Sequence, residues 1–215
     1  MRVIGKCPPD LEELRAAADD GFEAVELHLP RRYLADPTAI SDAVADSPVE
    51  VASVHTPHVT ADEFGLIERT DDLASALDAY LVVHSQYLQP MHVPELAALD
   101  LSRFGFENNP GTSVRHLEAT VLDRGHDLVL DTAHLYMAHA DYVARTESLL
   151  ETHGDAIRVV HLTDSTPTAD GVPFGEGEMD MAALTRVLRA RFDGDVVLEV
   201  MPEHQRSALR AVERY

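Results

Sequence analysis

The sequence of 215 residues contains one cysteine, one lysine and no tryptophan. The single cysteine, Cys7, excludes an intrachain disulfide. No stretch approaches the roughly 18 to 20 apolar residues that a membrane-spanning helix needs. The apolar run at the amino terminus is also too short for a signal peptide. These absences predict a soluble, cytoplasmic protein without a membrane partner.

Basic residues are scarce as well. The chain has 17 lysines and arginines against 38 aspartates and glutamates, a formal net charge of −21 at pH 7. Because binding to nucleic acid phosphates requires a basic patch, this balance disfavours a nucleic acid partner without excluding it. The acidic residues are spread along the chain, and Lys6 is the only lysine. This composition is typical of proteins from salt-loving organisms, whose carboxylates keep the surface solvated; the alternative is an ordinary acidic cytosolic protein.

Short apolar runs alternate with segments of helical periodicity. The runs predicted as strands are 2–4, 24–29, 49–54, 80–83, 104–107, 128–131, 157–162 and 196–200. The segments predicted as helices are 9–20, 64–77, 113–124, 140–153 and 179–191. The apolar runs are nearly continuous, which is typical of parallel strands covered on both faces. Gly21, Gly125 and Gly154 follow helical segments and are predicted as left-handed helix ends.

Eight such alternations predict an α/β fold, a compact (β/α)8 TIM barrel with short loops, formed by residues 1–215 as a single domain. The weakest unit is 90–102, which has room for a helix of only about two turns. An open doubly wound sheet is the structural alternative. It is disfavoured because no glycine-rich phosphate loop follows the first strand.

Side chains that can bind metals stand at or just after the carboxyl ends of six predicted strands. They are His55, His84, Glu107, Asp131, His161 and Glu199, and His134 follows three residues after Asp131. In a barrel these strand ends converge on one mouth, where sites are placed. A carboxylate at the end of an apolar strand is costly to bury unless it is paired or coordinated. The pattern therefore predicts a divalent-metal site; the alternative is a degenerate barrel without function.

The donor types divide this set in two. Three carboxylates and one imidazole come from Glu107, Asp131, His161 and Glu199. This oxygen-rich set suits Mn²⁺, Mg²⁺, Co²⁺ or Zn²⁺. His55 and His84 can join Glu107 around a second metal, where the additional imidazoles favour Zn²⁺. Two metals about 3.5–4 Å apart would suit a hydrolytic reaction.

The stretches that carry these residues resemble the xylose isomerase-like TIM-barrel superfamily, which holds sugar isomerases, keto-sugar 3-epimerases and endonuclease IV. The resemblance covers essentially the whole chain. Its most characteristic segment is Phe174-Gly175-Glu176-Gly177-Glu178-Met179-Asp180, followed by Val197-Leu198-Glu199. The other matching stretches are 21–27, 54–57, 82–84, 106–109, 130–134 and 160–165.

The isomerase and epimerase branch of that superfamily implies one divalent metal, held by the residues matching Glu107, Asp131, His161 and Glu199. Glu107 and Glu199 would be catalytic, exchanging a proton with a small sugar or sugar phosphate through an enediolate-like intermediate. The residue matching His134 would help to bind the substrate.

Other residues near the expected mouth are assigned more generally. Asn108 and Tyr87 are expected to line the pocket, and Lys6 lies on the correct face at the end of the first strand. Asp164 either orients a ligand or holds its loop. Arg31 and Arg32 could bind an anionic group, but pairing with nearby acids is the favoured interpretation. One of Glu26 and His28 faces the mouth, and His58 is placed at its rim.

The endonuclease IV branch implies two or three Zn²⁺ ions and extends the match to His55, His84 and His134. Asp170 stands where that branch has the aspartate of an Asp-x-His pair, but no histidine follows it. The alternative function is therefore a metal-dependent phosphodiesterase acting on abasic DNA or a smaller phosphoester. A non-catalytic metal or sugar binder is the third interpretation. The oligomeric state stays open, a homo-oligomer included.

Overall fold

The computed structural model describes residues 1–60, 62–84 and 93–215. These divide into two compact units, residues 4–107 and residues 1–3 together with 108–215. Tyr87, expected to line the pocket, and the start of the segment 90–102 lie outside the described residues.

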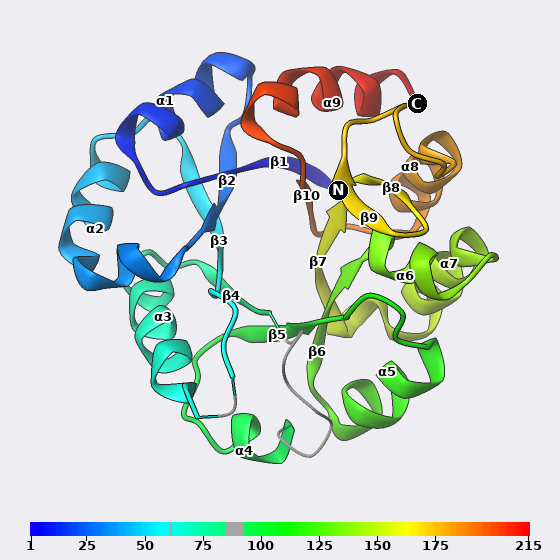
Figure 1. The fold of residues 1–215 in the computed structure, drawn as a ribbon, viewed down its shortest axis with the longest axis horizontal. Helices are drawn as coiled ribbons and strands as arrows, with labels where there is room; N and C mark the ends of the chain where they lie inside the picture. The colour runs from blue at the N-terminus through cyan, green and yellow to red at the C-terminus, as the bar shows by residue number, and fades with distance from the viewer. Residues whose placement is uncertain (61, 85–92) are drawn as a thin grey trace. The chain divides into compact units, whose positions relative to one another are not determined.

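Eight strands form a closed barrel in the order β1-β10-β7-β6-β5-β4-β3-β2, labelled in Figure 1. This confirms the predicted (β/α)8 class. The strands are β1 (Arg2–Cys7), β2 (Ala24–His28), β3 (Glu50–His55), β4 (Tyr80–Val83), β5 (Phe104–Glu107), β6 (Asp127–Asp131), β7 (Ile157–Leu162) and β10 (Asp195–Leu198). The predicted strand ends agree with the observed ones to within three residues. The agreement follows from burial: the continuous apolar runs are buried at almost every position.

In the unit of residues 4–107, short helices follow the strands. They are α1 (Leu11–Asp20), the 3-10 helix η1 (Arg31–Ala35), α2 (Pro37–Ala45), α3 (Phe64–Ala76) and α4 (Val93–Ala97). Gly21 has φ 103° and ends α1 in the left-handed conformation, as predicted. The side chain of Asp36 accepts a hydrogen bond from the amide of Ala39 and begins α2. The sequence analysis missed α2 because Ile40 is its only buried residue, so it has no apolar stripe.

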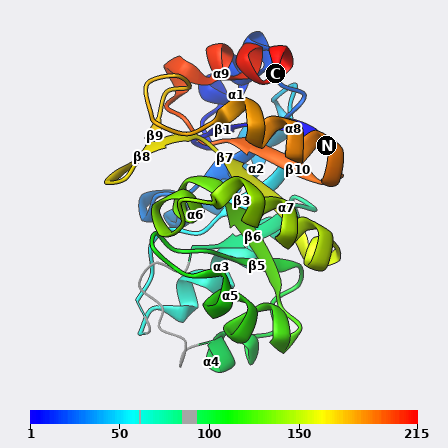
Figure 2. The same ribbon diagram turned by 90° about the vertical axis from the view of Figure 1, so that its right-hand side faces the viewer.

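In the unit that contains residues 108–215, the helices are α5 (Val114–Thr120), η3 (Leu122–Arg124), α6 (Thr132–Ala138), α7 (Tyr142–His153), η4 (Gly154–Ala156), α8 (Met181–Arg191) and α9 (Pro202–Arg214). Helices α7 and α8 lie side by side in both ribbon views (Figures 1 and 2). An antiparallel hairpin of β8 (Asp164–Thr166) and β9 (Ala169–Val172) projects from this unit in Figure 2. The prediction for Gly154 is wrong: its φ of −54° is right-handed, and the chain continues there into η4.

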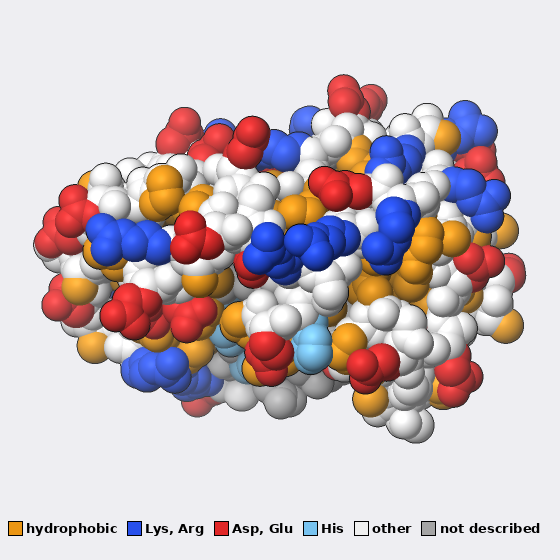
Figure 3. Space-filling model, turned by 90° about the horizontal axis from the view of Figure 1, so that it is seen from above, with side chains coloured by type: hydrophobic (Ala, Val, Ile, Leu, Met, Phe, Trp, Pro, Cys, Tyr) orange, Lys and Arg blue, Asp and Glu red, His pale blue; other side chains and the backbone are white. Residues whose placement is uncertain are grey.

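The surface carries both signs of charge. On the face shown in Figure 3, acidic, basic and hydrophobic side chains are interspersed. In the described part of the chain, every helix is too short or too polar to cross a membrane.

Candidate functional site

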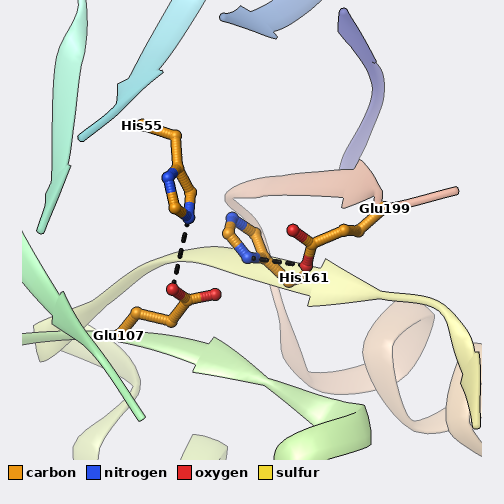
Figure 4. Close-up of side chains that lie close together, drawn as sticks. All are labelled: His55, Glu107, His161 and Glu199. Atoms are coloured by element: carbon orange, nitrogen blue, oxygen red, sulfur yellow. Dashed lines mark hydrogen bonds and ion pairs between the residues drawn. The ribbon is translucent and has the colours of Figure 1, made fainter. Parts of the chain in front are cut away.

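Two imidazoles of the unit 4–107 converge on one carboxylate oxygen. Glu107 Oε2 lies 3.2 Å from His55 Nε2 and 2.6 Å from His84 Nδ1. His55 and Glu107 are the last residues of β3 and β5, and His84 follows the intervening strand β4. All three are mostly buried, His84 being the most exposed at 12% of its side chain. The predicted grouping of these residues around Glu107 is therefore present, and the contact of His55 with Glu107 is drawn in Figure 4.

The hydrogen bonds of His55 indicate which nitrogen carries its proton. Nδ1 lies 2.8 Å from the carbonyl oxygen of Thr56, which can only accept, so Nδ1 must donate. Burial lowers the pKa of His55 and the Lys6 ammonium lowers it further, while Glu107 opposes them. The Nε2 contact depends on protonation: a protonated Nε2 donates to the Glu107 carboxylate, whereas a neutral ring turns a lone pair toward it. With Nδ1 held by a carbonyl oxygen, Nε2 is the nitrogen of His55 that could bind a metal together with Glu107.

Two further histidines lie beside this cluster. The His58 ring centroid is 4.1 Å from that of His84, and the His28 ring centroid is 6.1 Å from that of His55. Partial burial lowers the pKa of His58, and His84 and His55 lower it further. His58 is exposed, in keeping with the predicted place at the rim.

A charged pair lies on β1 and β2. The strand register places Lys6 opposite Glu26, and the ammonium is 3.0 Å from Glu26 Oε1. Ser53 Oγ donates a hydrogen bond of 2.8 Å to Glu26 Oε2. Residues two apart on a strand point to the same face, so Glu26 and His28 share one side of β2; Glu26 is fully buried, whereas His28, at the end of the strand, is exposed.

The arginines after β2 are engaged by their neighbours. Both terminal nitrogens of Arg31 bond the Glu63 carboxylate, and Nη2 also donates to the carbonyl oxygen of His58. The Arg31 guanidinium lowers the pKa of Glu63 to about 2, with help from Thr60. Arg32 lies 4.6 Å above the ring of Tyr33. The favoured interpretation, pairing with loop acids, is confirmed for Arg31.

In the unit that contains residues 108–215, His161 and Glu199 form the matching pair. His161 Nδ1 lies 3.2 Å from Glu199 Oε2, and this contact is drawn in Figure 4. The register of β7 and β10 pairs His161 with Val197, and Glu199 follows at the end of β10. His161 is fully buried, while 27% of the Glu199 side chain is exposed. Glu199 therefore meets solvent and ligands more readily than its partner does.

Asp131, His134 and Asn108 form a second group in this unit. Asp131 begins α6, because its Oδ1 accepts a bond of 2.8 Å from the His134 amide; its Oδ2 is 3.6 Å from His134 Nδ1. The side-chain amide of Asn108 bonds both the backbone N–H and the backbone carbonyl of Asp131. It thereby holds Asp131 in place.

His134 has acceptors at both ring nitrogens. Nδ1 lies 2.7 Å from the carbonyl oxygen of Asn108 and Nε2 lies 3.0 Å from Asp170 Oδ2 on β9. The bond with His134 lowers the pKa of Asp170. Asp170, which stands in for the expected aspartate, is thus brought to His134.

Asp164 serves its own loop. Its carboxylate, which is buried, accepts hydrogen bonds from the backbone amides of Ser165, Gly175, Gly177 and Met179. Of the two predicted roles, holding the loop is the one these contacts fulfil.

Each unit thus has buried histidine and carboxylate side chains that could hold a metal ion. Ligand atoms lie within 4.8 Å of one another for His55 with Glu107, for His161 with Glu199, and for Asp131 with His134. The sequence analysis missed Ser53 and Thr132, whose hydroxyls bond Glu26 and the carbonyl oxygen of His161. Both residues lie close to predicted strand ends, but serine and threonine are common there and do not by themselves indicate a functional site.

The comparisons with known proteins agree with this architecture. The family described as xylose isomerase-like TIM barrel matches residues 104–214. Among solved structures, 3-keto-D-glucoside 4-epimerase from E. coli superposes with a TM-score of 0.72 at 17% identity, covering 100% of both chains. D-allulose 3-epimerase from Methylomonas sp. gives 0.71 at 16% identity, covering 100% of this chain and 97% of that one. A xylose isomerase domain protein from Planctomyces limnophilus gives 0.70 at 15%, covering 99% and 94%. No curated protein matches the sequence significantly.

Proposed function

Because the chain belongs to the xylose isomerase-like TIM-barrel family, we propose that it is a divalent-metal-dependent isomerase or epimerase of a small sugar. The observation that carries the proposal is the set of buried carboxylates and imidazoles at the carboxyl ends of the barrel strands. We propose further that residues 1–215 act as a single domain. The epimerase names of the structural neighbours make sugars the first substrates to test.

The proposed metal ligands are Glu107, Asp131, His161 and Glu199. Sites of (β/α)8 barrels are built at the carboxyl ends of the strands, which supports the choice of these strand-end residues. The oxygen-rich donor set fits one Mn²⁺, Mg²⁺ or Co²⁺ ion. When bound, such an ion polarises a substrate carbonyl and acidifies the adjacent carbon.

The chain's own groups would then move the proton. Glu107 and Glu199 are the proposed acid and base, one removing a proton beside the carbonyl and the other returning it, through an enediolate-like intermediate. With Nδ1 of His134 held by the Asn108 carbonyl, its Nε2 would bind a substrate oxygen in exchange for Asp170, and Lys6 would bind another. Asn108 and Asp164 are proposed as positioning residues, since their polar atoms bond the backbone.

Proton exchange in deuterated water tests this function directly. The protein would be loaded with Mn²⁺, then exchanged into Mg²⁺, and incubated with a panel of ketoses and aldoses. Deuterium is expected at the carbon next to the carbonyl, observed by NMR, and EDTA should abolish it. Glu199→Gln should remove the exchange, whereas Glu203→Gln, an exposed residue of α9, should not. Deuterium exchange that persists in Glu199→Gln would contradict proton transfer by Glu199.

A second candidate function rests on one contact, the 2.6 Å between His84 Nδ1 and Glu107 Oε2. Together with His55, this contact forms a potential zinc site that a one-metal isomerase does not need. We therefore keep as the alternative a metal-dependent phosphodiesterase with two or three Zn²⁺ ions. Metal analysis separates the two: one ion per chain favours the isomerase, and two or three zinc ions favour the phosphodiesterase.

A further inference from the structure

We infer that the substrate is an uncharged sugar and not a sugar phosphate. This inference rests on the proposed function and narrows its substrate class. Two independent features carry it, one in each unit of the chain. In one unit, carboxylates already pair two of the cations beside the strand ends. In the other, a cradle of backbone amides that would suit an anion is filled by the protein itself.

The cations can be traced completely, because none of the 17 lysines and arginines falls among the undescribed residues. Three of them, Lys6, Arg31 and Arg32, lie at or after the carboxyl end of a barrel strand. Apart from Arg115, the exposed second residue of α5, the other arginines lie farther along helices or at the amino ends of strands, the end of a barrel opposite to its site. Among the cations that lie at a strand end or directly after it, a phosphate at the mouth would therefore depend on these three.

Two of the three are neutralised locally. The Lys6 ammonium is 3.0 Å from Glu26, and Ser53 holds the other oxygen of that carboxylate. The Arg31 guanidinium forms a two-pronged pair with Glu63. A bidentate pair uses the face of the guanidinium that would otherwise grip a phosphate. The third, Arg32, is stacked on Tyr33.

The backbone offers the second route to a phosphate. TIM barrels frequently bind phosphate with the loops after their last two strands, through backbone amides. In this chain four amides of that region point at Asp164, with N···O distances of 2.8 Å from Ser165, 2.9 Å from Gly175, and 3.1 Å from both Gly177 and Met179.

Glycine allows this close approach. A Cβ on Gly177 would lie 2.2 Å from Asp164 Oδ1, so the amide reaches the carboxylate only because position 177 has no side chain. These four amides form a binding site for an anion, and the Asp164 carboxylate occupies it. A substrate phosphate would have to displace a buried carboxylate from four hydrogen bonds. Sugar hydroxyls need no neutralising charge, so they suit a site whose cations are already paired with carboxylates better than a phosphate does.

The test compares sugars with their own phosphates. Calorimetric titration of the metal-loaded full chain would use several ketopentoses and ketohexoses, each beside its terminal phosphate ester. At least one free sugar is expected to bind tenfold or more tightly than its phosphate. Tighter binding of a phosphate ester, or no binding of any free sugar, overturns the inference.

The same samples keep this result separate from the proposed function. A free sugar that binds without deuterium exchange contradicts the proposed reaction and leaves the inference standing. A sugar phosphate that binds more tightly than its free sugar and is turned over contradicts the inference and leaves the proposed reaction standing.

Variants that remove the carboxylate partners of Arg31 and Lys6 test whether neutralisation of these cations is the cause of the preference. Glu63→Gln frees Arg31 and should raise the affinity for sugar phosphates by roughly two- to fivefold, the range of an exposed ion pair, with the free sugar unaffected. Glu68→Gln, an exposed residue of α3, is the matched control and should change neither affinity. Glu26→Gln should act in the same direction through Lys6, and circular dichroism would check that it folds. An unchanged phosphate affinity in Glu63→Gln contradicts neutralisation as the cause.

Discussion

At the residue scale, the decisive side chain is His84. Its Nδ1 and the Nε2 of His55 meet at the same oxygen of Glu107. A carboxylate between two imidazoles serves either as a hydrogen-bond acceptor that orients them or as a ligand that shares a metal with them. These two roles differ in what happens when one imidazole is removed.

His84→Ala is therefore expected to leave the deuterium exchange of an isomerase within a few-fold of the original. For a two-metal phosphodiesterase it should cost more than the roughly 10–100-fold that losing an outer-shell partner costs. Exchange rates and bound metal per chain are the measurements. His204→Ala, on α9, is the control. Loss of exchange together with loss of one metal would contradict the one-metal assignment.

Cys7 provides a second prediction at this scale. Burial raises the pKa of its thiol to about 12, with smaller contributions from the carboxylates of Glu13 and Asp10. Since the thiolate is the reactive form, the folded protein should not react with a disulfide reagent such as dithionitrobenzoate at pH 8. One thiol per chain should appear after unfolding in guanidinium. Rapid release of colour from the folded protein would contradict the burial of Cys7.

The single-residue assignments that sequence could supply were those at strand ends. His55, Glu107, Asp131 and His161 each terminate or nearly terminate a continuous apolar run, and the structure has each of them at or next to the last residue of its strand. The pairing of Glu26 with Ser53 could not be predicted from the sequence, because it depends on a register shift between Val25 and Glu26. A one-residue shift of this kind leaves no mark in the sequence pattern.

At the scale of elements, the segment from β8 to the start of α8 (Met181–Arg191) is organised around one carboxylate and not around an apolar core. The hairpin carries Asp170 to His134, and Asp164 holds the chain on both sides of it. Such a segment has no hydrophobic periodicity, which explains why the sequence analysis did not predict the hairpin. Helix α9 was missed for a related reason, since its buried face consists of alanines, one valine and a glutamine.

Gly177→Ala tests that organisation. The new methyl group would overlap the Asp164 carboxylate, so we expect a destabilisation of about 1–3 kcal/mol, as for overpacked sites. Gly65→Ala is the matched control, because its position in α3 has nothing within 4 Å of the added atom. That change should stabilise the protein by about 0.5–1 kcal/mol, the usual gain of alanine over glycine within a helix. Denaturant midpoints measure both, and a neutral Gly177→Ala would refute the close packing.

At the scale of the whole molecule, the family and the fold were accessible from sequence because many weak signals occur in one order. Each strand-end motif alone is common, but all of them in this order and spacing point to one family. The net charge of −21 is a property of the same scale, since acidic residues lie throughout the chain. It leads to a prediction about stability in salt that does not depend on the proposed function.

Mutual repulsion of the excess carboxylates destabilises the folded chain, and salt should relieve it. The Debye length falls from about 10 Å at 0.1 M salt to about 3 Å at 1 M, so the melting temperature should rise over this range. NaCl and KCl should act alike at equal ionic strength if screening is the cause. The dependence should shrink near pH 4.7, the isoelectric point, because few net charges then remain to be screened. A melting temperature that is flat or falls with salt at pH 7 would show that local ion pairs, such as Arg31 with Glu63, outweigh the net repulsion.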